Sequence, residues 1–218
     1  MVAAKPLLAA ALLGLVCASA ALGDNPTVKI EKADQAKAVA ALLRRADFGS
    51  GWTGGPVKPH SLNAPHCPGF DPKESDLVVT GHADARYAFS QGDVELDQDV
   101  QVLKSAAAVR TDFRRTISPA LGRCLALQLK KLSGVTATSV ARVAFPRTGD
   151  VSAVYRATIS VRNGKTRGKL LSDYVFFGAG RVEYEFTVVA PPGAGPQLMK
   201  FEVGLAQILL KRAGELTA

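Results

Sequence analysis

Alternating hydrophobic and polar residues predict most of the strands of this chain. The clearest alternation runs over residues 151–162, where the odd positions are Val, Ala, Tyr, Ala, Ile and Val. Asn163-Gly164 follows it and predicts a tight hairpin turn. A return strand over residues 168–177 and a third strand over residues 181–189 complete an expected meander. Further strands are expected at residues 77–80, 87–89, 94–104 and 139–145.

Helical spacing of apolar residues predicts two consecutive helices in the middle of the chain. Ser105 is the expected N-cap of a helix that reaches Thr116. Ser118 followed by Pro119 predicts a second helix, because serine favours the N-cap and proline the first helical position. Leucines at helical spacing place Cys124 on the apolar side of this second helix.

Two more helices are predicted near the ends of the chain. Asp34 is the expected N-cap of a helix over residues 35–45, and the last helix is expected from Pro196 to Gly214. The last helix is so apolar that we expect it to pack on the meander. Glycine and proline predict a loop over residues 54–72. These elements predict an α+β fold, with helices packed on the faces of an antiparallel sheet.

The N-terminal residues are typical of a signal peptide, with Lys5 followed by an apolar run from Leu7 to Val16. We expect residues 1–23 to be removed, leaving residues 24–218 as a single secreted domain. The apolar run is too short to span a bilayer, and no later stretch is both long and uncharged, so no membrane helix is expected in the mature chain. Lipid anchoring at Cys17 is not expected, because the position before it is usually small in lipoproteins and here it is valine.

The chain is basic, with a formal net charge of +8. This charge indicates either a solvated basic surface or an affinity for anionic envelope polymers or lipid headgroups. Removal of the signal peptide leaves two cysteines, Cys67 and Cys124. In an oxidising compartment the expected outcome is a disulfide between them, and two free buried thiols are the alternative.

The polar face of the strand predicted over residues 94–104 carries Glu95, Asp97 and Asp99. Three carboxylates in line could form a calcium site or an acid/base site. The alternative is the solvated face of a sheet, where such carboxylates pair with arginines on a neighbouring strand. The alternation favours this second interpretation.

The three histidines and one cysteine are candidate metal ligands: His60, His66, Cys67 and His82. Their spacing does not match structural zinc patterns, and a disulfide would remove the thiolate. We therefore expect no metal and no cofactor.

The sequence contains neither a G-x-S-x-G motif nor a phosphate-binding loop, so no catalytic residue is assigned and the protein is not expected to be an enzyme. A hydrolase would need a cleft in which Asp97 or Asp99 meets a histidine or a bound metal. Trp52, the single tryptophan, is either a core residue or the anchor of a ligand cleft.

The two central helices form the most basic part of the chain. Their positive side chains are not interleaved with aromatic residues, which argues against nucleic-acid binding. They form a candidate surface for an envelope partner, made by Arg114, Arg115, Arg123 and Lys130.

A series of short motifs adds a resemblance that covers nearly the whole mature chain. They are Leu42-Leu43, Ala46-Asp47-Phe48, Gly51-Trp52-Thr53, Cys67, Asp76-Leu77-Val78-Val79-Thr80-Gly81, Ala106-Ala107-Ala108-Val109-Arg110 with Phe113, Arg123-Cys124-Leu125-Ala126 and Phe145-Pro146. In this order they resemble the extracellular sensor-type domains of actinobacterial serine/threonine kinases and the exported lipoproteins similar to them.

This resemblance implies a PsbP-like α+β sandwich with a cleft, a family disulfide between Cys67 and Cys124, and a non-catalytic role. The chain departs from the kinases in having no kinase domain, no membrane helix and no second pair of mature cysteines. The resulting hypothesis is a secreted bacterial binding or sensor-like domain that holds a small or lipid-like envelope ligand between sheet and helices. The alternatives are a protein interaction or stability factor that uses the basic helical surface, and a hydrolase.

Overall fold

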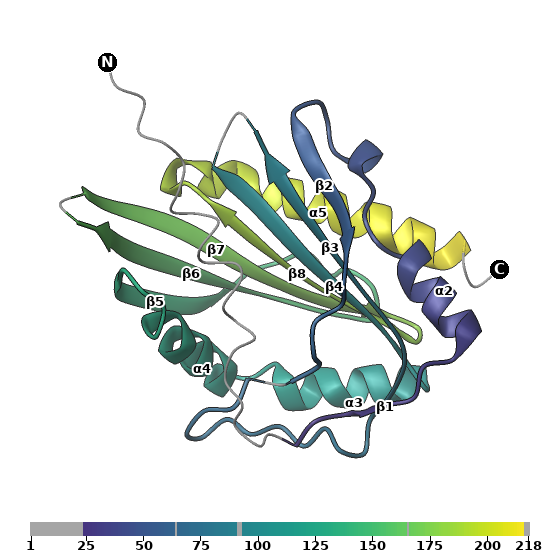
Figure 1. Cartoon of the computed structure of the whole chain (residues 1–218). Coiled ribbons are helices and arrows are strands. Elements are labelled where there is room, and N and C mark those ends of the chain that lie inside the picture. Colours follow the sequence, from purple (N-terminus) through teal and green to yellow (C-terminus); the bar gives the residue numbers. More distant parts are fainter. Residues whose placement is uncertain (1–23, 64, 91–92, 165, 216–218) are drawn as a thin grey trace.

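The computed structural model describes residues 24–63, 65–90, 93–164 and 166–215; the predicted signal peptide, including Cys17, lies outside them. The described residues form an α+β fold around one eight-stranded sheet (Figure 1). The strands are β1 (Thr27–Val28), β2 (Trp52–Val57), β3 (Val78–Phe89), β4 (Val94–Leu103), β5 (Val135–Val143), β6 (Val151–Asn163), β7 (Thr166–Ala179) and β8 (Val182–Ala190). The helices are α2 (Lys32–Ala40), α3 (Ala106–Thr116), α4 (Pro119–Lys130) and α5 (Gly195–Glu215), with short 3-10 helices η1 (Arg45–Asp47) and η2 (Pro192–Ala194).

The strands lie in the order β1-β3-β4-β8-β7-β6-β5, and β2 pairs with β3 outside this path. All neighbours are antiparallel except β1, which runs parallel to β3. The sheet is therefore mixed, whereas the sequence predicted an antiparallel one. The β1–β3 pair is only two residues long, too short to leave a periodic signal.

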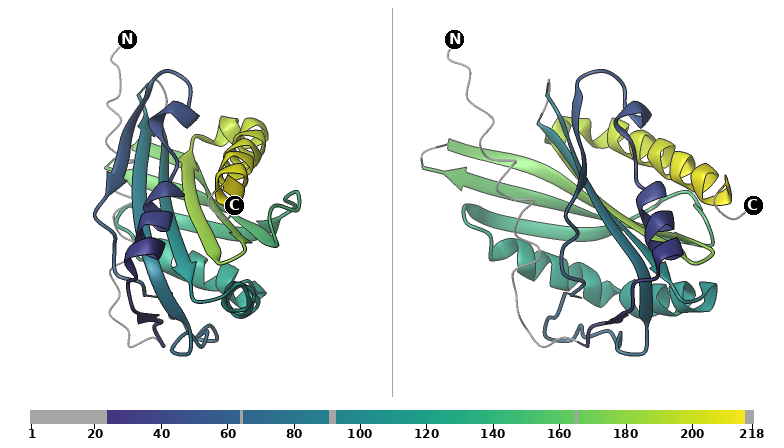
Figure 2. Two further views of the ribbon diagram at one scale, coloured as in Figure 1. Left: turned by 90° about the vertical axis from the view of Figure 1, so that its right-hand side faces the viewer. Right: turned by 45° about the vertical axis from the view of Figure 1, so that its right-hand side comes forward.

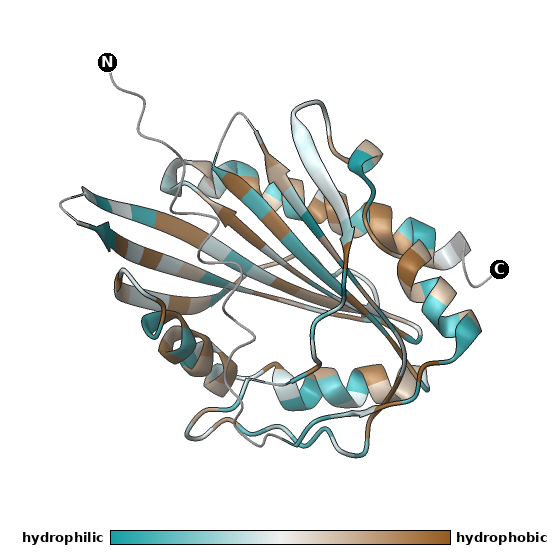
Figure 3. Ribbon diagram, in the orientation of Figure 1, coloured by the Kyte–Doolittle hydropathy of each residue, from teal (hydrophilic) through white to brown (hydrophobic). Residues whose placement is uncertain are grey.

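Both faces of the sheet bury apolar side chains, because successive residues of a strand point to opposite faces. Figure 3 shows hydrophobic and hydrophilic residues alternating along several strands. On β7, Val175 packs into one cluster with α2 and α5, and its neighbour Phe176 packs into another with α4 and Cys67. Figure 2 shows α5 lying along one side of the sheet. The expected packing of the last helix on the meander is thus confirmed.

The two central helices begin where the sequence predicted. The side chain of Ser105 accepts a hydrogen bond from the backbone N–H of Ala108, 3.1 Å away, and Ser118 caps the N-terminus of α4 in the same way. Strands β4, β6, β7 and β8 also match their predicted ranges to within two residues at each end. Strand β5 begins four residues before its predicted start.

The first helix was misplaced by the sequence. It spans Lys32–Ala40 rather than residues 35–45, and Asp34 lies inside its first turn instead of capping it. Asp34 is buried and pairs with Arg181, while its Oδ2 also accepts a hydrogen bond from Thr80 at 2.6 Å. The aspartate is therefore used for a tertiary contact that no local pattern reveals.

Part of the predicted loop over residues 54–72 is in fact the edge strand β2. Pro56 is compatible with an edge strand, because its position need not donate to a second neighbour. Gly54 has a φ of +116°, and a Cβ there would lie 2.1 Å from the carbonyl oxygen of Arg86. Gly54 therefore allows β2 and β3 to approach each other closely and does not mark a turn. The short strands predicted at residues 77–80 and 87–89 are likewise one continuous strand, β3.

Cys67 and Cys124 form the predicted disulfide, with their Cα atoms 5.5 Å apart. The bridge ties the irregular segment that follows β2 to helix α4. Across the described ranges, no helix is both long and apolar enough to cross a membrane.

Candidate functional site

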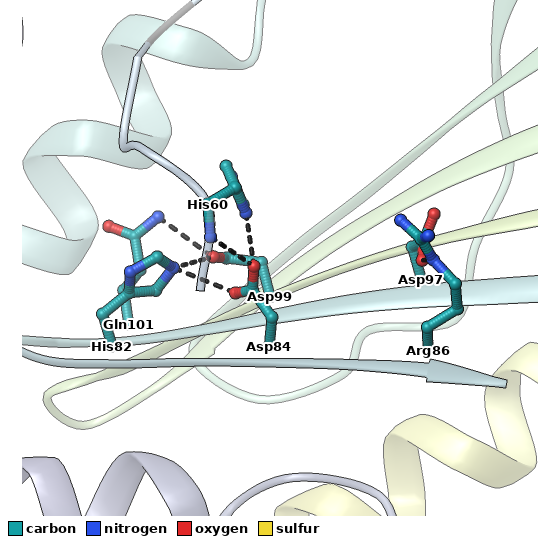
Figure 4. A network of polar contacts seen from close by, with 7 residues as sticks. All are labelled: His60, His82, Asp84, Arg86, Asp97, Asp99 and Gln101. Atoms are coloured by element: carbon teal, nitrogen blue, oxygen red, sulfur yellow. Dashed lines mark hydrogen bonds and ion pairs between the residues drawn. The ribbon is translucent and has the colours of Figure 1, made fainter. Parts of the chain in front are cut away.

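Four polar side chains converge on the sheet face opposite α2 and α5, and we call them the His–Asp cluster: His60, His82, Asp84 and Asp99 (Figure 4). Strand β3 supplies His82 and Asp84, and β4 supplies Asp99. The β3–β4 register places Asp84 directly opposite Asp99. His60 comes from the segment after β2, which crosses this face.

The contacts within the cluster are short. The Nε2 atom of His82 lies 2.6 Å from Asp99 Oδ2 and 3.0 Å from Asp84 Oδ1. The Nδ1 atom of His60 lies 2.5 Å from Asp84 Oδ2. The side chains of His82, Asp84 and Asp99 are 8%, 9% and 12% exposed, whereas that of His60 is 39% exposed. Three of the four side chains are therefore largely buried, and the cluster reaches solvent at His60.

Groups around the cluster hold its members in place. The backbone N–H of His60 donates to Asp84 Oδ2 at 2.9 Å, and the side-chain amide of Gln101 donates to Asp99 Oδ1 at 3.0 Å. The side chain of Gln35 bonds both the backbone N–H and the backbone carbonyl of His82. These contacts fix the backbone and orient both carboxylates.

The cluster strongly shifts the pKa values of its histidines. Burial alone would lower the pKa of His82, but its close contacts with Asp84 and Asp99 outweigh burial and raise that pKa to about 9. The hydrogen bond with Asp84 also raises the pKa of His60, against a smaller opposing effect of burial. Burial opposes ionisation of Asp84, yet its contacts with both histidines bring its pKa well below its usual range.

Further carboxyl groups lie on the adjacent strand β8 and on α3. Glu185 pairs across strands with Asp99, and burial together with the charge of Asp99 raises the pKa of Glu185 to about 8. Burial and the nearby Asp112 raise the pKa of Glu183 well above its usual range. The protein thus concentrates acidic groups on this face although its net charge is positive.

Of the three carboxylates predicted on the polar face of β4, two have partners of the expected kinds. Asp97 pairs with Arg86 on β3, with 2.5 Å between the guanidinium Nε and Oδ1, which confirms the expectation of arginine pairing for this residue. Asp99 instead meets His82, the contact that a hydrolase would require. Asp99 and Asp97 thus have different partners although they lie only two residues apart.

The candidate metal ligands His60, His66, Cys67 and His82 do not all lie together in the structure. Cys67 is in the disulfide, and His66 pairs with Asp71 at 2.9 Å. His60 and His82 come together, but with Asp84 and Asp99, which the sequence did not group with them. Asp84 was missed because its strand was predicted as two pieces, although the alternation of Ala83 and Ala85 with polar neighbours was a usable signal.

The basic surface predicted on the central helices is not continuous. Arg115 makes two hydrogen bonds with the carboxylate of Asp76, and Arg114 bonds Thr111 on its own helix. On α4, Arg123 and Lys130 are exposed. Arg123 lines a shallow hollow of about 310 Å³ whose other walls are Pro119, Gly122, Ala126, Val140, Arg142 and Tyr155.

Trp52 lies within a group of aromatic rings. Its ring centroid is 4.7 Å from that of Phe48 and 5.6 Å from those of Phe201 and Phe89. These contacts account for Trp52 as a residue that closes the core between β2 and α5. Its role as the anchor of a ligand cleft stays a prediction.

No family model matches the chain, and no curated protein matches it in sequence.

Proposed function

We propose that the protein is a secreted, non-catalytic, sensor-like binding domain whose ligand is a small cation held at the His–Asp cluster. The observation that carries this proposal is the excess of acidic groups on the polar sheet face. Asp84 and Asp99 are joined there by Glu185 on β8, while His60 leaves a path to solvent. Both aspartates already contact a histidine nitrogen, and a bound cation would take the place of the protons in these contacts.

The secreted location is supported by the N-terminal signal pattern and the disulfide, because disulfides persist in oxidising compartments. The PsbP-like sandwich and the relation to kinase sensor domains belong to the same proposal and depend on the short motifs. The absence of recognisable catalytic motifs from the sequence supports a binding role rather than catalysis.

A polar ligand is favoured over a lipid-like one. The region between β2 and α5, one of the places between sheet and helix, is packed with the rings of Phe48, Trp52 and Phe201. Ligand pockets are concave and mostly preformed. The four side chains of the His–Asp cluster already lie together on the sheet face (Figure 4).

Small cations are expected to raise the unfolding temperature of the purified protein. A ligand at about 100 times its Kd adds roughly 2.7 kcal/mol, or about 5–10 °C for a domain of this size. Thermal unfolding with divalent metal chlorides, spermidine or ethylammonium, compared with sodium phosphate and sodium acetate, measures this shift.

Two variants test whether the rise in unfolding temperature comes from cation binding at the His–Asp cluster. Asp99→Asn should abolish the shift produced by cations, whereas Asp97→Asn on the same strand should keep it, because Asp97 is paired with Arg86. The proposal is wrong if no cation stabilises the protein, or if both variants respond alike.

A second candidate function is an interaction of α4 with an acidic envelope protein. It is favoured by the exposure of Arg123 and Lys130 and by the hollow that Arg123 shares with Arg142. The double variant Arg123→Glu/Lys130→Glu should then lose at least 10-fold in capture of partners from envelope extract. Arg115→Gln, which removes a charge already paired with Asp76, is the control; equal capture by both variants would reject this function.

A further inference from the structure

We propose that the His–Asp cluster binds one divalent transition-metal ion through His60 Nδ1, His82 Nε2, Asp84 Oδ1 and Asp99 Oδ2. This inference deepens the proposed function and rests on it, since it names the cation. It departs from the expectation of no metal that the histidine spacing gave.

The four ligand atoms already have nearly the spacing that an ion needs. One ring nitrogen of each histidine and one carboxylate oxygen of each aspartate all lie within 4.8 Å of one another. Ligands about 2.0–2.1 Å from a tetrahedral zinc ion are roughly 3.3 Å apart. His82 Nε2 lies 2.6 Å from Asp99 Oδ2 and 3.0 Å from Asp84 Oδ1, so each of these two pairs would open by less than about 1 Å when an ion binds between them.

One carboxylate oxygen is buried without a hydrogen bond among the described residues, and it points into the cluster. Asp84 Oδ1 lies 3.0 Å from His82 Nε2 but makes no hydrogen bond with it. The single proton on Nε2 can be directed at only one acceptor, and Asp99 Oδ2 is closer, at 2.6 Å. A metal ion at this point would bind both oxygens at once, which a proton cannot do.

The opposite oxygen of each carboxylate accepts a hydrogen bond from a group that is not a proposed ligand atom. Asp84 Oδ2 accepts the backbone N–H of His60, and Asp99 Oδ1 accepts the amide of Gln101 (Figure 4). Asp84 Oδ2 also contacts His60 Nδ1, and this contact would open when Nδ1 binds the ion. Outer hydrogen bonds of this kind orient metal ligands and commonly change metal affinity 10- to 100-fold. Each aspartate is therefore fixed through one oxygen and presents the other to the ion.

The ligand chemistry identifies the class of ion. Two imidazoles with two carboxylates suit Zn²⁺, Co²⁺, Ni²⁺ or Mn²⁺, whereas Mg²⁺ and Ca²⁺ favour oxygen ligands alone. Thiolate is not available, because Cys67 and Cys124 are joined to each other. Two carboxylates also neutralise the charge of a divalent ion, which favours its burial beside Glu185.

Binding is also expected to fix the segment after β2. His60 is the one ligand that does not come from the sheet, and its side chain is the most exposed of the four. The ion would join this segment to β3 and β4, whereas the disulfide joins it, further along the chain, to helix α4.

Titration calorimetry of the purified protein, made without a histidine tag, tests the inference. ZnCl₂ and CoCl₂ should each bind with a stoichiometry of one. The Co²⁺ complex should show the visible absorption of a nitrogen and oxygen site, without the near-ultraviolet band of thiolate ligands. MgCl₂ at the same concentration should give no measurable binding.

His60→Ala should weaken zinc binding by at least 10-fold, and Asp99→Asn should do the same. The matched control is His66→Ala, which removes a histidine from the same segment that pairs with Asp71 outside the cluster. Far-ultraviolet circular dichroism of all three variants confirms that they are folded. Zinc binding that is unchanged in His60→Ala would overturn the inference.

Spermidine and ethylammonium distinguish this inference from the proposed function. If they bind in an Asp99-dependent manner and zinc does not, the proposed metal site is rejected and the cation-binding function is retained. If neither zinc nor an ammonium ion binds, the metal site and the cation-binding function are both rejected. Stoichiometric zinc binding that depends on His60 and not on His66 supports both.

Discussion

Replacing Glu202 with glutamine is expected to raise the free energy of unfolding by about 3 kcal/mol at pH 7 and to leave it almost unchanged at pH 4. Glu202 lies on α5 and is fully buried against Asp173, which is itself buried and forms an ion pair with Arg156. Burial, followed by the charge of Asp173, raises the pKa of Glu202 to about 9. Two carboxyl groups thus share one guanidinium, and one of them keeps its proton.

The direction of the pH dependence follows from proton binding. Between the ordinary pKa of 4.5 and about 9, the folded protein holds a proton on Glu202 that the unfolded chain has released. Stability therefore falls by roughly 1.4 kcal/mol for each pH unit across this window. Glutamine cannot ionise, and its amide can still donate to Asp173, so the variant lacks this loss.

Urea unfolding at pH 4, 7 and 9 measures the effect as the difference between variant and wild type. Glu31→Gln, at an exposed position before α2, serves as the control and should show no such pH dependence. A difference for Glu202→Gln that stays constant from pH 4 to pH 9 would contradict the assignment.

Removing the disulfide should have a still larger effect. The double variant Cys67→Ala/Cys124→Ala is expected to lose about 4 kcal/mol, because the bridge closes a loop with a sequence separation of 57. Both cysteines are buried with Phe70 and the leucines of α4, so the segment after β2 would lose its main attachment.

Guanidinium unfolding of the variant and of the wild type, each with and without reductant, measures this loss. The reductant should lower the stability of the wild type to near that of the variant and leave the variant unchanged. A loss below about 1 kcal/mol would mean that the buried contacts of the segment, rather than the bridge, hold it in place.

The elements that the sequence predicted well are those with local signals. Helices α3 and α4 were found because Ser105, Ser118 and Pro119 mark their starts within a few residues. Strands β4, β6 and β8 were found because one face is buried and the other is not, so their residues alternate.

The errors come from residues whose roles depend on distant partners. The sequence predicted that Asp34 caps a helix. Its actual partner, Arg181, is 147 residues away and leaves no local signal. Strand β3 was divided at Gly81, yet a Cβ at Gly81 would lie 2.3 Å from the backbone oxygen of Asp34. That glycine allows α2 to approach the strand and does not interrupt it.

The candidate site could be predicted only in part for the same reason. Asp99 and His82 were each noted, but their meeting depends on the β3–β4 register, and a shift of one residue would turn either side chain to the other face. His60 lies in an irregular segment, where no periodicity indicates which way a side chain points. Their convergence required the tertiary structure.

The position of β8 in the sheet has a consequence for how the chain folds. Strand β4 has β8 as a neighbour, with Glu95 opposite Val189, so the centre of the sheet joins residues from distant parts of the chain. The hairpin of β3 and β4 therefore has an unpaired edge on β4 until the last strand emerges. We therefore expect slow, late folding after synthesis and a need for protection from aggregation during that interval.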